Sequence, residues 1–74
     1  MFEKAKLKAK IRKCKKEIAA LEQKRVRSQA ALVEAILTHQ APKDDDVEFF
    51  NKYTAQIETV RQKMHELQQQ LKEM

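Results

Sequence analysis

Residues 50–74 read FNKYTAQIETVRQKMHELQQQLKEM, and an apolar side chain recurs there at every third or fourth position. The recurring residues are Phe50, Tyr53, Ile57, Val60, Met64, Leu67, Leu71 and Met74. Alternating spacings of three and four are the heptad pattern of a helix that packs along another helix. The stretch therefore predicts one long helix whose apolar seam requires a second helix to cover it.

A second apolar seam lies in the N-terminal half and consists of Leu7, Ile11, Cys14, Ile18 and Leu21. Pro42 separates the two seams, and proline ends helices because it lacks the backbone N–H group. We expect an all-α, antiparallel, coiled-coil-like hairpin with helices over about 4–40 and 46–73 and a turn over about 41–45. The alternative is one continuous helix of about 70 residues that Pro42 only kinks.

The composition also favours helices. The 74 residues include no glycine, one proline and no tryptophan, and 36% of them are charged. Tight β-turns depend on Gly, Asn and Pro, whereas Lys, Arg, Glu, Gln, Ala and Leu favour helices. The length suits one small domain, so residues 1–74 are expected to form a single hairpin.

The expected turn sets a register between the helices. With the turn centred near residues 42–43, Leu21 would lie opposite Met64. The second helix would then end opposite about residue 11, so residues 1–10 would overhang as a basic arm.

The first seam meets polar residues after Leu21, because its next positions are Arg25 and Ser28. A new apolar run begins one residue later and consists of Val26, Ala30, Val33 and Leu37. We expect the frame to slip here and the helix to twist locally. Arg25 would either extend to solvent or form a polar layer with Glu58 that sets the register.

The turn carries the acidic residues Asp44, Asp45 and Asp46. Asp45 with Glu48 three residues later has the spacing of a capping box, and negative charge favours a helix N-terminus. Calcium loops need glycine and alternating oxygen ligands, which this segment lacks. The triplet therefore predicts helix capping and no metal site.

The apolar surface widens near the turn beyond what one seam per helix can bury. The candidate partner-binding residues are Val33, Ile36, Leu37, Val47, Phe49, Phe50 and Tyr53. Leaving each large apolar side chain in water costs about 1.5–3 kcal/mol. We expect a second copy to cover this surface and form a four-helix bundle, or a different protein with a groove for it. The alternative is that these side chains merely thicken the hairpin.

Positive charge gathers at the N-terminal end of a chain whose net charge is +5. The candidate residues for an anionic partner are Lys4, Lys6, Lys8, Lys10, Arg12, Lys13, Lys15 and Lys16. Nucleic acid and acidic protein are the possible partners, and a solvated face without a partner is the alternative. The narrow apolar stripe beside these residues does not suit a membrane-surface helix.

The sequence contains no recognisable catalytic or metal-binding motif. Cys14 occupies a seam position, so we interpret it as a small buried hydrophobe rather than a reactive or cross-linking thiol. His39 is expected in the last turn of the first helix and His65 in solvent. We expect no enzyme activity, catalytic residue, cofactor or metal. With one cysteine and no long apolar run, a cytoplasmic protein without a membrane span is expected.

Two helices joined by the turn Ala41-Pro42-Lys43-Asp44-Asp45 resemble the small hairpins of type III secretion co-chaperones and needle subunits. The plan is also similar to plasmid RNA-regulating hairpins that dimerise into four-helix bundles. This resemblance implies function through helix packing and assigns no role to single residues. We expect a small protein–protein interaction module, such as an adaptor, a co-chaperone-like protein or an inhibitor subunit. A nucleic-acid-binding hairpin and a part of a larger assembly are the alternatives.

Overall fold

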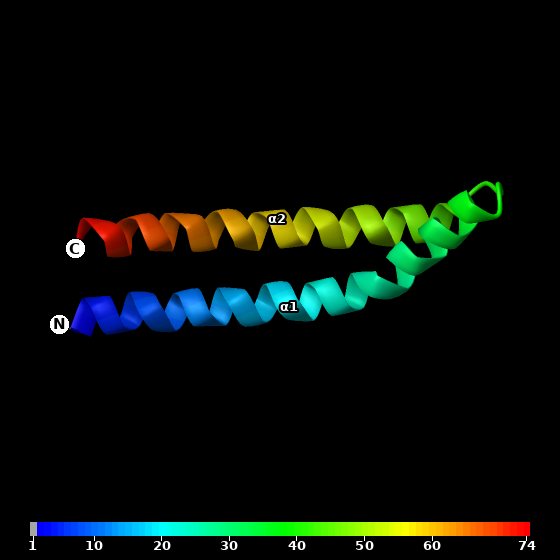
Figure 1. Ribbon diagram of the computed structural model, residues 1–74. Coiled ribbons are helices and arrows are strands. Elements are labelled where there is room, and N and C mark those ends of the chain that lie inside the picture. Colours follow the sequence, from blue (N-terminus) through cyan, green and yellow to red (C-terminus); the bar gives the residue numbers. More distant parts are fainter. Residues whose placement is uncertain (1) are drawn as a thin grey trace.

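The structure is a computed structural model that describes residues 2–74. It contains helix α1 over Phe2–Leu37 and helix α2 over Asp44–Glu73, joined by residues 38–43. The helices run antiparallel, so both termini lie at one end of a long hairpin (Figure 1). The molecule is 55 Å long and 17 by 16 Å across. The predicted all-α hairpin is confirmed, and the single kinked helix is not formed.

One apolar seam joins the two helices. Its buried members are Leu7, Ile11, Cys14 and Ile18 of α1 and Ile57 and Leu67 of α2. Val60, Met64 and Leu71 pack against the cluster that Leu67 forms with α1. Ile57 is 2% exposed and Cys14 is 3% exposed, so these two lie deepest in the seam. The interpretation of Cys14 as a small buried hydrophobe is confirmed.

Beyond Leu21 the α1 seam keeps its spacing, so the expected frame slip is wrong. The next seam positions are Arg25, Ser28, Leu32 and Ala35, all buried or half-buried. The apolar run that a slip would have buried, Val26, Ala30, Val33 and Leu37, is exposed along its whole length. Polar side chains therefore occupy two positions of the helix–helix contact, and an apolar stripe is left outside it.

Arg25 forms a polar layer across the seam. Its Nη1 atom donates a hydrogen bond to Thr54 Oγ1 at 3.0 Å, and its guanidinium carbon lies 5.2 Å from the centre of the Phe50 ring. The Arg25 Nε atom is buried and has no hydrogen-bond partner among residues 2–74. A polar layer was one of the two expected outcomes, but its partner on α2 is Thr54 rather than Glu58.

The end of α1 is determined by His39, which adopts the left-handed conformation with φ of 56°. The His39 N–H group donates to the Ile36 carbonyl oxygen at 3.2 Å. The Gln40 N–H group reaches back to the Ala35 carbonyl oxygen at 2.9 Å. This pair of bonds is a Schellman motif, which normally uses glycine at the left-handed position. Because the chain has no glycine, histidine takes that position.

The earlier end of α1 changes the register of the hairpin. α1 ends at Leu37 rather than near residue 40, and the connection is centred N-terminal to Pro42. Leu21 consequently shares a groove with Val60 instead of facing Met64. Along α2, Val60 and the expected partner Met64 are separated by close to one helical turn.

The same shift removes the expected basic overhang. Leu7 is buried in one cluster with Leu67, and Met74 lies beside Glu3 and Lys6 at the open end of the hairpin. Residues 2–10 therefore pair with the end of α2 rather than extending beyond it. Met1, which was also assigned to the arm, lies outside the described residues.

The start of α2 also differs from expectation. α2 begins at Asp44, and its N-cap residue is Lys43, whose side chain makes no capping hydrogen bond. The predicted capping box of Asp45 and Glu48 is therefore wrong. The three aspartates lie instead within the first turn, where their negative charge interacts favourably with the helix dipole.

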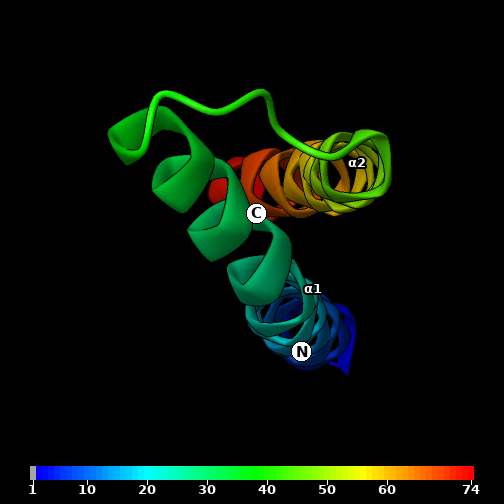
Figure 2. The same cartoon turned by 90° about the vertical axis from the view of Figure 1, so that its right-hand side faces the viewer.

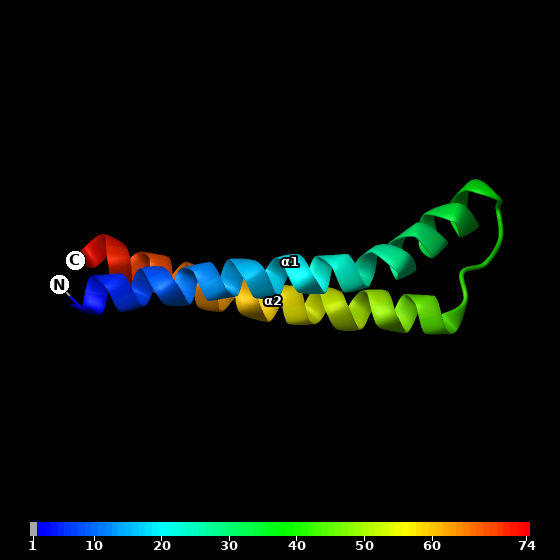
Figure 3. The ribbon, with the colours of Figure 1, turned by 90° about the horizontal axis from the view of Figure 1, so that it is seen from below.

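The turn-proximal part of α1 diverges from α2. Figures 2 and 3 show the green part of α1 leaning away, whereas the blue and cyan part runs alongside α2. The seam residues in this part, such as Leu32 and Ala35, are only half-buried. The turn-proximal end therefore offers less shelter to apolar side chains than the open end does.

Replacing His39 with glycine should stabilise the hairpin by about 1 kcal/mol, because glycine adopts the left-handed conformation without steric cost. Urea denaturation followed by circular dichroism measures this change. Gln40→Gly is the matched control and should be neutral or destabilising, because glycine there only increases the conformational entropy of the unfolded chain. Equal destabilisation by both variants would contradict the assigned role of His39.

Thr54→Val should destabilise the hairpin by about 1–3 kcal/mol, because the Arg25 guanidinium loses its acceptor on α2. The control is Thr59→Val, since Thr59 Oγ1 bonds only to the Ala55 carbonyl oxygen within α2. That control should change stability by less than about 0.5 kcal/mol. In an Arg25→Leu background the cost of Thr54→Val should largely disappear, and a cost that persists there would argue against the polar layer.

Candidate interaction surfaces

An exposed apolar stripe runs along α1 near the turn. It consists of Val26, Ala30, Val33 and Leu37, which we call the outer stripe. Val26 is 58% exposed, Val33 is 49% exposed and Leu37 is 74% exposed. With Gln29 and Glu34 these residues line an open groove of about 440 Å³. The spacing of four, three and four is that of a coiled-coil seam.

The outer stripe faces away from α2. At 100° per residue, its centre lies about 150° around α1 from the line of Arg25, Ser28, Leu32 and Ala35 that contacts α2. The heptad spacing of the stripe is visible in the sequence, and Val33 and Leu37 were among the predicted partner-binding residues. Val26 and Ala30 were not among them.

The structure divides the seven residues predicted to bind a partner. Val47, Phe50 and Tyr53 are half-buried beside the helix contact, and Phe50 lies under the Arg25 guanidinium. Val33, Ile36, Leu37 and Phe49 are exposed, with Ile36 at 70% and Phe49 at 48%. Phe49 stacks on Tyr53 with ring centres 6.5 Å apart.

Two edges of the helix pair can be told apart by their contacts. On one edge Arg61 Nη2 lies 3.6 Å from Glu22 Oε1. Val26 follows Glu22 by one helical turn, so the outer stripe begins on the flank of α1 that carries this ion pair.

Phe49 belongs to the other edge. It lies two turns before Gln56, which lines a groove with Lys24 and Ala20 of α1. Ala20 and Lys24 lie roughly 160° around α1 from Glu22. Phe49 and the outer stripe are therefore separate surfaces rather than one continuous patch.

The open end of the hairpin carries the basic residues. All eight predicted cations between Lys4 and Lys16 are exposed, and none forms an ion pair within residues 2–74. They follow α1 on both sides of the buried seam that includes Leu7 and Ile11. Because α1 is paired with α2 here, these charges are displayed on a folded surface.

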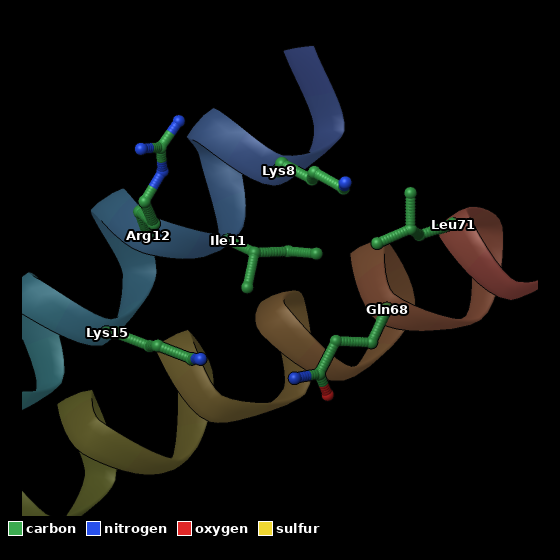
Figure 4. Close-up of a pocket in the computed structure, with 6 residues that line it drawn as sticks. All are labelled: Lys8, Ile11, Arg12, Lys15, Gln68 and Leu71. Atoms are coloured by element: carbon green, nitrogen blue, oxygen red, sulfur yellow. The ribbon is translucent and has the colours of Figure 1, made fainter. Parts of the chain in front are cut away.

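A basic groove between the helices is the most structured part of this end. Lys8, Arg12 and Lys15 of α1 line it with Gln68 and Leu71 of α2, around Ile11, and its volume is about 520 Å³ (Figure 4). Lys8 and Lys15 extend toward α2, and the Gln68 amide points toward Lys15, whereas Arg12 points away from α2. Ammonium, guanidinium and amide groups suit phosphate or carboxylate oxygens.

Within the described part of the chain, no three His, Cys, Asp or Glu side chains gather as metal ligands would. Neither helix there has a segment with the length and hydropathy needed to cross a membrane. The candidate interaction surfaces are the outer stripe and the basic end.

No protein-family model, curated protein or solved structure matches this chain.

Proposed function

We propose that this protein is a small, non-enzymatic interaction module that binds an amphipathic helix along the outer stripe of α1. The observation that carries the proposal is the exposure of Val26, Val33 and Leu37 at heptad spacing on the side of α1 that faces away from α2. A helix whose own apolar residues follow the same spacing can interdigitate with such a stripe.

Burial of the outer stripe contributes favourably to the binding free energy. Burying apolar surface contributes about 25 cal/mol per Å². Covering Val26, Val33 and Leu37 therefore offsets part of the entropy lost on association. α1 is already ordered by its seam with α2, which means that the outer stripe does not have to fold when the partner arrives. This preorganisation lowers the cost of binding.

A second candidate function is nucleic-acid binding at the open end. The observation that favours it is the set of eight exposed cations at this end, which form no ion pair within residues 2–74 and of which Lys8, Arg12 and Lys15 line the basic groove. Lysine and arginine bind phosphates electrostatically, and such binding needs no base-specific contact. The two surfaces lie toward opposite ends of the hairpin, so both activities are compatible with one chain.

Val33→Asp should weaken partner binding by more than about tenfold, because it places a charge in the centre of an apolar contact. Phe49→Asp is the matched control, since it introduces the same charge at a similarly exposed apolar position on the other edge. Self-association by sedimentation and capture from an extract of the source cells are the measurements. Circular dichroism verifies that both variants remain helical.

The proposal would be contradicted if Val33→Asp left association unchanged and Phe49→Asp abolished it. The binding site would then lie on the edge that carries Phe49. Equal effects of the two variants would also contradict it, because the outer stripe would then have no special role.

Combined replacement of Lys8, Arg12 and Lys15 by glutamine should weaken binding to a short fluorescent DNA duplex. If all three contact phosphates, the slope of log K against log salt should decrease by about 2–3. Fluorescence anisotropy over a salt series measures both quantities.

The matched control replaces Lys24, Lys43 and Lys63, which removes the same charge from other exposed positions. It should retain most of the affinity. Absence of DNA binding by the wild-type chain at low salt, or equal losses in both triple variants, would exclude a specific role for the basic groove.

A further inference from the structure

We infer that the outer stripe binds the outer stripe of a second copy, with the two α1 helices antiparallel. This inference rests on the proposed function and names its partner. The stripe, its flanking charges and the basic end of α1 all favour this arrangement over a parallel one.

The outer stripe is self-complementary. A two-fold axis perpendicular to α1 and between Ala30 and Val33 places Val26 opposite Leu37 of the second copy. The same axis places Ala30 opposite Val33, so a small side chain meets a larger one in both central layers. An isologous contact of this kind needs one surface only, which is why two-fold dimers are the commonest oligomers.

The charges beside the outer stripe are complementary under the same axis. Arg27 and Glu34 follow Val26 and Val33 by one position and lie within about 20° of each other around α1. Both are exposed, and neither forms an ion pair within residues 2–74. The axis brings Arg27 of each copy to Glu34 of the other, which makes two equivalent ion pairs along one side of the contact.

The other side of the contact covers an exposed apolar residue. Ile36, which is 70% exposed, lies on the same flank of the stripe as Gln29. The two-fold axis places Ile36 of each copy against the Gln29 side chain of the other. Long polar side chains cover apolar surface with their methylene groups, so the dimer shelters Ile36 as well as the stripe.

Charge at the basic end disfavours the parallel alternative. Parallel α1 helices would place the eight cations of one copy beside the eight of the other, with repulsion along that whole end. The antiparallel arrangement directs the basic ends to opposite sides of the dimer. Like charges are then separated by more than the distance over which salt screens them.

Sedimentation equilibrium over a concentration series tests the inference, with the wild-type chain, Arg27→Glu, Glu34→Arg and the double variant that exchanges the two charges. The contact follows only a short part of α1, so we expect a concentration-dependent dimer of the weaker class. Each single reversal puts like charges together at two places and should weaken the dimer by about tenfold. The double variant should regain the wild-type affinity.

Mixing the two single variants tests the antiparallel arrangement directly. Arg27→Glu carries two acidic groups beside the stripe, and Glu34→Arg carries two basic groups. In the antiparallel dimer these meet as opposite charges at both places, so the mixture should form a heterodimer more tightly than either variant forms a homodimer.

The outcomes separate this inference from the proposed function. A wild-type chain that stays monomeric at every concentration, or a dimer that ignores the charge reversals and the mixing, overturns the inference. In either case, capture of another protein that Val33→Asp abolishes and Phe49→Asp retains would leave the proposed function standing. A dimer that survives Val33→Asp also overturns the inference, and the proposed function is overturned with it if Val33→Asp leaves capture of other proteins unchanged as well.

Discussion

The structure depends on a single line of contact between α1 and α2. Two helices can bury only one stripe each, and here that stripe is the seam that contains Ile57, Leu67 and the apolar residues of α1 from Leu7 to Leu21. Every other apolar side chain within residues 2–74 is half-buried or exposed. The outer stripe is exposed for this geometrical reason, and a further helix is the kind of molecule whose shape fits it.

The position of the connection governs what happens at the open end. Because His39 closes α1 at Leu37, the start of α1 lies beside the end of α2, and Leu7 is buried against Leu67. The lysines of α1 are therefore held on an ordered helix instead of on a free arm. A basic groove with contributions from both helices exists only because Gln68 and Leu71 of α2 reach this region.

Arg25 separates the two halves of the molecule. On its N-terminal side the α1 seam is apolar, whereas on the turn side it contains the buried polar Ser28 and the half-buried Leu32 and Ala35, and α1 leans away from α2 (Figures 2 and 3). A polar layer costs stability but favours one register, since a shifted pairing would leave the guanidinium without Thr54. The layer thus lies between the open end, which carries both termini and displays charge, and the turn end, which displays apolar surface.

The heptad spacings and Pro42 were sufficient to predict two helices and the residues of both seams except Met74, which is 56% exposed, because periodicity and proline stereochemistry are local properties of the chain. The tertiary structure decided between the two apolar runs of α1 after Leu21, which both have heptad spacing. Arg25 could be accepted in the seam because Thr54 and Phe50 lie opposite it, and no local pattern reveals residues so distant in sequence. The register likewise followed from where His39 ended α1. Because the chain has no glycine to mark the end of a helix, the sequence does not reveal this position.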